Sequence, residues 1–219
     1  MMILIIANGD LTEGEWLQPL LQQAEVVMAV DGGLAHLQRL GVTPDFLIGD
    51  LDSLTPEQKT AVAAANIQQI TYPSQKDETD LELALLYACE QFPDAEIVVA
   101  ASLGGRLDQT LANLLLLAHP DLQGHTIRLL ARYQRAWLLT PADSPAHIEG
   151  KIDDLVSLLP LGGDVTVVYT DGLEWPLHDE KLTFGPARGV SNRLKAVSAT
   201  VAISSGHLLI VHTDGAWGR

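Results

Sequence analysis

A change of pattern near residue 136 limits the possible folds more than any other feature of this sequence. Before that point, short apolar runs alternate with segments whose apolar residues recur at helical spacing. Beyond it no long helical segment follows, and short apolar runs are separated by turn-forming residues. The first pattern predicts an α/β domain with a mostly parallel sheet and helices on both faces. The second predicts a C-terminal all-β domain, a small antiparallel sandwich or barrel.

The expected elements give the two domains their boundaries. We expect an α/β domain over residues 1–139 and a β-sandwich domain over residues 146–219, joined by a proline-containing segment at 140–145. Helix starts are predicted at Thr55-Pro56 and at Thr79-Asp80, where a capping residue precedes the helix. The expected strands are 3–7, 26–30, 46–48, 97–101, 137–139, 156–159, 165–169, 199–203 and 208–211, and the expected helices are 15–23, 34–40, 79–91, 109–118 and one from 55.

Composition excludes several classes of protein. The formal net charge of −15 argues against binding to nucleic acid, which needs clustered Lys and Arg. The single cysteine, Cys89, allows no disulfide within the chain, and its apolar surroundings favour a core position. No segment has the length and apolarity of a membrane span, and the apolar start lacks a basic leader. The cytoplasm is therefore the expected location.

Two carboxylates follow the strand expected at 46–48. Asp50 and Asp52 stand two residues apart, so in extended chain they project to the same side. Open α/β sheets bind ligands at the carboxyl ends of their strands, and oxygen ligands of this kind suit Mg²⁺. The alternative is that Asp52 or Ser53 caps a loop while Asp50 faces water.

Other glycine-containing or charged motifs fall at the same predicted edge. Glycines there let the backbone approach phosphates, and acidic side chains fit if Mg²⁺ lies between them and a polyphosphate. Each motif also has a simpler explanation as a turn, a favourable charge in the first turn of a helix, or a surface ion pair. The motifs are Asn8-Gly9-Asp10, Asp31-Gly32-Gly33, Lys76-Asp77-Glu78-Thr79-Asp80 and Gly104-Gly105-Arg106-Leu107-Asp108.

The order and spacing of these motifs resemble the thiamine pyrophosphokinase family. The resemblance spans nearly the whole chain, although the family varies at the positions of Lys76 and Gln109. The segments that carry it are Asp31-Gly32-Gly33, 44–53, 76–80, 104–109, 171–177 and Gly189-Val190-Ser191-Asn192.

The resemblance implies a reaction and a set of site residues. The family transfers a pyrophosphoryl group from ATP to the hydroxyl of thiamine, releases AMP, and works as a homodimer with thiamine bound between subunits. It implies that Asp50, Asp52 and Asp80 hold Mg²⁺, with Arg106 and Asp108 completing the catalytic group. The residues implied to face ATP are Asp31, Gly32, Gly33, Lys76, Thr79, Arg106, Asp108 and Gln109, and those implied to bind thiamine are Leu173, Trp175, Ser191 and Asn192.

Physical chemistry agrees with this reading and leaves some alternatives open. Carboxylates that bind metal and an arginine are the parts that phosphoryl chemistry needs, and an indole face suits the thiamine cation. Trp175 also fits a core or edge aromatic of the sandwich, and Asp52, Asp80 and Asp108 are equal candidates for assisting deprotonation. A nucleotide- or sugar-phosphate-binding protein without activity, or a phosphatase with an aspartyl nucleophile, are the alternative functions.

Overall fold

The computed structural model describes residues 1–50, 54–73 and 75–215. The chain forms two compact units, Met1–Ala131 and Arg132–Arg219. The first is α/β and the second is built from strands, which confirms the predicted fold class. The strand at 134–139 pairs with the strand at 208–213, which belongs to the second unit. The predicted domain boundaries, 1–139 and 146–219, stay a prediction. In the described part of the chain, no helix has the length and apolarity needed to cross a membrane.

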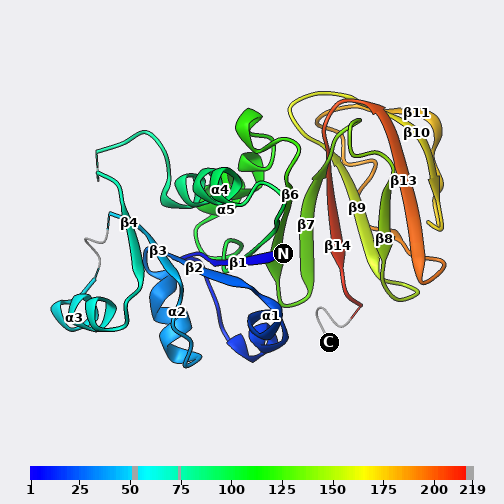
Figure 1. The fold of residues 1–219 in the computed structure, drawn as a ribbon. Coiled ribbons are helices and arrows are strands. Elements are labelled where there is room, and N and C mark those ends of the chain that lie inside the picture. The colour runs from blue at the N-terminus through cyan, green and yellow to red at the C-terminus, as the bar shows by residue number, and fades with distance from the viewer. Residues whose placement is uncertain (51–53, 74, 216–219) are drawn as a thin grey trace. The chain divides into compact units, whose positions relative to one another are not determined.

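A six-stranded parallel sheet forms the first unit, in the order β6-β5-β1-β2-β3-β4. Helices α1, α2 and α3 lie on one face of this sheet and α4 and α5 on the other (Figure 1). The strands are β1 Met2–Ile6, β2 Val26–Val30, β3 Phe46–Gly49, β4 Gln68–Thr71, β5 Glu96–Ala100 and β6 Thr126–Ala131. The helices are η1 Gly14–Leu17, α1 Gln18–Gln23, α2 Gly33–Arg39, α3 Pro56–Ala64, α4 Asp80–Gln91, α5 Leu107–Leu116 and η2 Pro120–Leu122.

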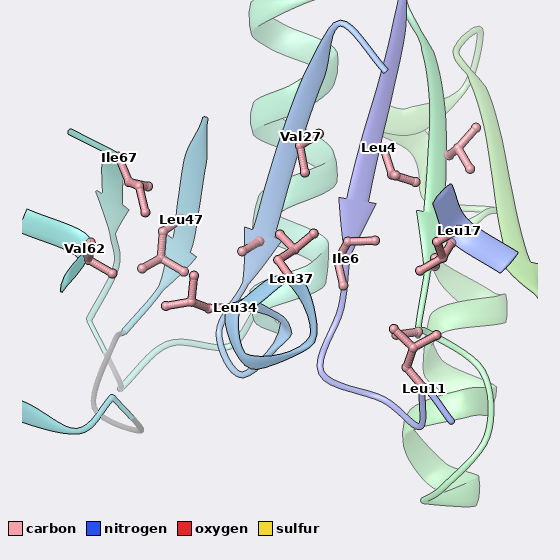
Figure 2. Close-up of a cluster of buried hydrophobic side chains, with 14 of the residues drawn as sticks. Leu4, Ile6, Leu11, Leu17, Val27, Leu34, Leu37, Leu47, Val62 and Ile67 are labelled. Atoms are coloured by element: carbon pink, nitrogen blue, oxygen red, sulfur yellow. The ribbon is translucent and has the colours of Figure 1, made fainter. Parts of the chain in front are cut away.

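Apolar side chains from strands and helices fill the space beneath the sheet. Figure 2 shows Ile6 of β1 next to Leu37 of α2, and Leu47 of β3 next to Leu34 of α2, all fully or almost fully buried. Burying such a side chain contributes about 1.5–3 kcal/mol, so this layer anchors the loops that leave the strands. Cys89 lies in the core as predicted, and burial raises the pKa of its thiol to about 11.

Local signals set where the helices begin. Helix α3 begins at Pro56 as predicted, and the Thr79 hydroxyl caps α4 by accepting a 3.2 Å hydrogen bond from the Glu82 amide. The single helix expected over 15–23 is instead a 3-10 turn followed by α1. Pro19 in the first turn of α1 explains the break, because it has no N–H to extend a helix through this point.

The strands of the second unit pair in two antiparallel sets of four, in the orders β12-β9-β14-β7 and β11-β10-β13-β8. Their inner faces share one core, with Val156 and Ile210 from one sheet and Val167 and Val201 from the other. The unit is therefore a β-sandwich, as predicted. Its strands are β7 Gln134–Leu139, β8 Ala146–Glu149, β9 Leu155–Pro160, β10 Val165–Asp171, β11 His178–Leu182, β12 Asn192–Arg193, β13 Ser198–Ser205 and β14 Leu208–Thr213.

Candidate active site

A cavity of about 500 Å³ lies at the carboxyl ends of the strands in the first unit. Strands β2, β3 and β4 follow one another on one side of β1, whereas β5 and β6 lie on its other side. The order of the strands therefore reverses at β1 and β5, which is where open α/β sheets bind their ligands. The cavity is lined by the loops that follow β1, β2, β3, β4 and β5, by the start of α4 and by residues of α5.

The β1 and β5 ends that form part of this cavity are held tightly together. The Gly9 amide donates to the Ala101 carbonyl at 2.7 Å, and a Cβ added at Gly9 would lie 2.3 Å from that oxygen. A side chain at this position would push the two strand ends apart. The loop after β1 thus requires glycine for packing.

Asp31-Gly32-Gly33 lies partly inside the cavity. Asp31 lines it and accepts a hydrogen bond from the Asn8 amide at 3.3 Å, whereas the two glycines are not among its lining residues. A Cβ at Gly32 would lie 2.1 Å from the Asn8 side chain, and one at Gly33 would lie 2.1 Å from the Ile6 carbonyl. Close packing of α2 against the end of β1 therefore explains both glycines. Their role in binding ATP stays a prediction.

Carboxylates from separate loops line one part of the cavity. Asp50, directly after β3, and Asp80, the first residue of α4, both belong to the lining. The Lys76 ammonium contacts Asp80 Oδ1 at 2.5 Å and lies 5.4 Å from the centre of the Tyr72 ring. Thr79, whose hydroxyl caps α4, also lines the cavity. Asp52 lies outside the described residues.

Oxygen donors of this kind fit a hard cation such as Mg²⁺. Within residues 1–50, 54–73 and 75–215, no three carboxylate, imidazole or thiol side chains are grouped closely enough to hold a metal ion. The predicted trio of Asp50, Asp52 and Asp80 is not fully described, so its geometry is untested.

The glycine-rich loop after β5 carries Arg106 into the lining. Gly104 and Gly105 have φ values of +89° and +73°, a conformation that glycine adopts without strain. The Arg106 guanidinium donates two hydrogen bonds of 3.1 and 2.6 Å to the Asp108 carboxylate, and both side chains are exposed. Its hydrogen bonds hold the pKa of the Asp108 carboxyl below the usual range. Arg106 and Gln109 line the cavity, whereas Asp108 is not among its lining residues.

Several cavity residues were not predicted as site residues. Asn8 and Asp10 stand in a motif that the strand-end rule had marked, but no role was assigned to them. Ser102 and Asn113 carry no local signal, since one follows a strand and the other lies within a helix. The tertiary structure brings them together, because the Asn113 amide donates to the Ser102 carbonyl at 2.7 Å. Glu78 is the remaining polar side chain in the lining to which no role was assigned.

The predicted thiamine residues belong to the second unit. The Trp175 side chain is 56% exposed, which excludes the core alternative. The Asn192 side-chain amide fixes the Trp175 backbone. It accepts a 3.1 Å hydrogen bond from the Trp175 N–H and donates a 2.8 Å hydrogen bond to the Trp175 carbonyl. Ser191 is exposed, and its N–H donates to the Ser157 hydroxyl at 3.0 Å. Leu173, by contrast, is buried in the sandwich core, so its side chain packs against the protein.

Comparisons with known proteins find matches to both halves of the chain. A family model for "Thiamin pyrophosphokinase, catalytic domain" matches residues 17–129, and one for "Thiamin pyrophosphokinase, vitamin B1 binding domain" matches residues 147–209. Thiamine pyrophosphokinase of Bacillus subtilis is 28% identical over 186 residues, covering 85% of this chain and 86% of that protein. Thiamine pyrophosphokinase 3 of Oryza sativa is 30% identical, covering 76% of this chain and 64% of its own length.

Solved structures are similar to this chain over almost its full length. The Bacillus subtilis thiamine pyrophosphokinase structure has a TM-score of 0.85 at 27% identity, covering 98% of this chain and all of that chain. The structure of a thiamin pyrophosphokinase family protein from Enterococcus faecalis has a TM-score of 0.85 at 25% identity, covering 98% and 99%. With two matching domain models and this shared fold, the chain belongs to the thiamin pyrophosphokinase family.

Proposed function

We propose that this protein transfers the pyrophosphoryl group of ATP to the hydroxyl of thiamine, giving thiamine diphosphate and AMP. The observation that carries the proposal is one cavity at the switch point of the sheet that combines Asp50 and Asp80 with Lys76 and Arg106. A binding protein has little need for such carboxylates beside the phosphates, whereas a transfer site uses them with a metal ion. Matches to both a catalytic and a vitamin B1 binding domain support this choice.

In the proposed reaction the thiamine hydroxyl oxygen bonds to the β-phosphorus of ATP. The bond from that phosphorus to the oxygen bridging to the α-phosphate breaks, AMP leaves with this oxygen, and the hydroxyl proton passes to a carboxylate or to water. Asp50, Asp52 and Asp80 would hold Mg²⁺, which would offset charge on the phosphoryl oxygens. Lys76, Arg106 and Gln109 would orient the polyphosphate, with Asp31 and Thr79 beside it. Asp108 is a poor base, because Arg106 stabilises its ionised form.

Thiamine would stack its cationic ring on the exposed indole of Trp175. We further propose a homodimer, in which thiamine binds between subunits. Exposed Leu107, Leu111 and Leu115, spaced four residues apart along α5, support it, since a solvent-facing apolar helix stripe gains by being covered. The cytoplasm stays the predicted location.

The test is to incubate the protein with ATP, Mg²⁺ and thiamine and to separate the nucleotide products. AMP and thiamine diphosphate in equal amounts are the expected result. ADP would mean transfer of a single phosphoryl group, and the absence of any product that depends on thiamine would overturn the proposal. Replacing thiamine by a thiamine analogue without the hydroxyl controls for simple ATP hydrolysis.

A further inference from the structure

The hydroxyl of Ser102 is buried at the cavity without a hydrogen-bond partner. Ser102 follows β5, is 3% exposed, and belongs to the lining of the cavity. Within the described part of the chain, its Oγ is one of two buried side-chain polar atoms that have no partner, and the other, His125 Nδ1, is not at the cavity. Leaving a buried hydroxyl unpaired costs free energy, so a group that would pair with it is expected from outside the protein.

The backbone around Ser102 is fixed from two sides. Ala101, directly before it, has a φ of +56° and accepts the 2.7 Å hydrogen bond from the Gly9 amide. The Ser102 carbonyl accepts the 2.7 Å hydrogen bond from Asn113, a side chain that is itself buried. Since both contacts hold the main chain, Ser102 is anchored in the lining of the cavity.

The charges in the lining indicate which ligand atom suits this hydroxyl. The loops after β2 and β3 and the start of α4 contribute Asp31, Asp50 and Asp80. The β5 side contributes Ser102 and the glycine-rich loop that ends in Arg106, with Asp10 of the loop after β1 close to Gly104. A phosphorylated ligand that places a metal ion toward the carboxylates leaves phosphoryl oxygens for the β5 side, where a hydroxyl can donate to them.

We propose that the Ser102 hydroxyl donates a hydrogen bond to a phosphoryl oxygen of the bound nucleotide. It is then a specificity-determining residue that favours a phosphorylated ligand over the bare nucleoside. This inference rests on the proposed function, because it takes the nucleotide of that reaction as the occupant of the cavity.

The test is the Ser102→Ala variant of the full chain, studied by titration calorimetry with Mg²⁺ and α,β-methylene-ATP, and separately with adenosine. The variant is expected to bind the ATP analogue about tenfold more weakly, as for the loss of one hydrogen bond to a charged group, and to bind adenosine as wild type does. Its melting temperature without ligand should equal or exceed that of wild type, because the substitution removes an unpaired buried hydroxyl.

Ser144→Ala is the matched control, since the Ser144 hydroxyl accepts a 2.9 Å hydrogen bond from the Ile203 amide in the second unit. It should lower the melting temperature and leave the affinity for the analogue unchanged. Unchanged affinity in Ser102→Ala, or equal losses for the analogue and adenosine, overturns the inference. Failure of the wild-type protein itself to bind the analogue would overturn the proposed function, and the inference with it. Ser102→Gly gives the same readouts if the alanine variant does not fold.

Discussion

Each basic residue in the described lining of the cavity contacts a carboxylate. Lys76 contacts Asp80, and Arg106 grips Asp108. The second pair is largely exposed, so it contributes little to stability and can be exchanged for a phosphate at low cost. The carboxylates therefore keep these two cationic side chains in place until a more highly charged ligand takes the place of the carboxylates.

Asp50→Asn is the sharpest test of the proposed metal site. It keeps the size of the side chain but removes the charge, so we expect turnover to fall at least a hundredfold while the melting temperature changes little. Steady-state assays at saturating Mg²⁺ measure the effect. Asp94→Asn, an equal change at an exposed residue outside the cavity, should leave turnover unchanged. More than a tenth of wild-type activity in Asp50→Asn would remove Asp50 from the metal site.

At the scale of elements, the strands that the sequence predicted are those with a continuous apolar run. β1, β2 and β5 are buried over most of their length, so their composition alone identifies them. β4, Gln68–Thr71, has three exposed residues and no apolar run, and it forms by pairing with β3 at the edge of the sheet. β11, His178–Leu182, has mostly exposed residues and similarly depends on β10. Strands of this kind are specified by their neighbours, which a local pattern does not contain.

The loop that carries Trp175 depends on β12 for its position. Asn192 forms both hydrogen bonds to the Trp175 backbone, so Asn192→Ala releases the loop and removes the partner of two partly buried backbone groups. We expect a loss of about 1–3 kcal/mol in the free energy of unfolding and a higher KM for thiamine, with the KM for ATP unchanged.

Trp175→Ala serves as the matched variant, because its exposed side chain contributes little to folding. It should raise the KM for thiamine at least as far without lowering stability. Equal effects of either variant on the KM for thiamine and for ATP would place this loop outside the acceptor site.

At the scale of the whole molecule, the residue pattern predicted only the site residues covered by one rule, that open α/β sheets bind ligands at the carboxyl ends of their strands. That rule marked Asp31, Asp50 and Arg106, since each follows a strand, and all three line one cavity. It could not find Asn113, which lies inside α5 and reaches the cavity only because α5 packs beside the end of β5. The family resemblance implied a role in binding ATP for Gly32 and Gly33; this role stays a prediction, and contacts with Asn8 and Ile6 already require glycine at both positions.

The proposed dimer predicts that the stripe on α5 is covered. Leu111→Glu places a charge among Leu107 and Leu115, so we expect sedimentation velocity to show monomers where wild type shows dimers, with activity lost in parallel. Gln91→Glu adds the same charge at an exposed position of α4 and should keep the dimer. A Leu111→Glu variant that sediments as a dimer would show that the interface lies elsewhere.

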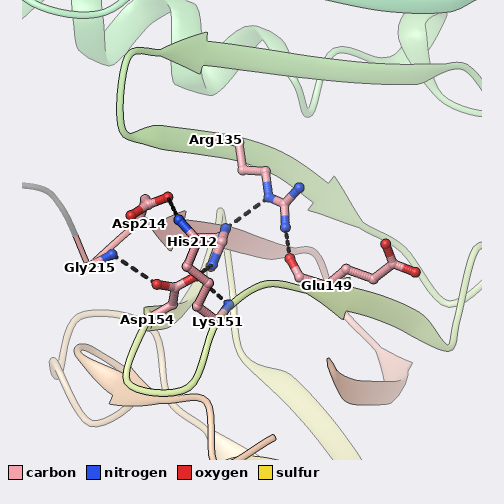
Figure 3. A network of polar contacts seen from close by, with 7 residues as sticks. All are labelled: Arg135, Glu149, Lys151, Asp154, His212, Asp214 and Gly215. Carbon is pink, nitrogen blue, oxygen red and sulfur yellow. Dashed lines mark hydrogen bonds and ion pairs between the residues drawn. The ribbon is translucent and has the colours of Figure 1, made fainter. Parts of the chain in front are cut away.

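A buried polar network makes the second unit sensitive to acid. Figure 3 shows His212 between Arg135 and Asp154, with Gly215 bonded to the same aspartate. Arg135 can only donate, so His212 Nδ1 accepts its 2.9 Å hydrogen bond and Nε2–H donates to Asp154 at 2.9 Å. The imidazole is therefore neutral. Burial, together with the Arg135 charge, lowers the pKa of His212 below its usual 6.5.

This network fixes the sign of the pH dependence. Because the pKa of His212 is lower in the folded chain, its contribution to stability is complete above about pH 6.5 and is lost as the pH falls. Burial raises the pKa of Asp154, but hydrogen bonds from Lys151, Gly215 and His212 outweigh it and leave the pKa lowered, so further stability is lost below about pH 4.

Urea denaturation at pH 7 and pH 5 should show a lower free energy of unfolding at the lower pH. His212→Gln is expected to unfold about 1–3 kcal/mol more easily at pH 7, since it leaves Arg135 and Asp154 poorly paired, and to lose less stability than wild type between the two values. His147→Gln, at an exposed position of β8, should keep the wild-type difference. An identical pH dependence in His212→Gln and wild type would mean that another group governs acid unfolding. Because Asp154 also accepts a hydrogen bond from the Gly215 amide, acid should also release Gly215 from this network.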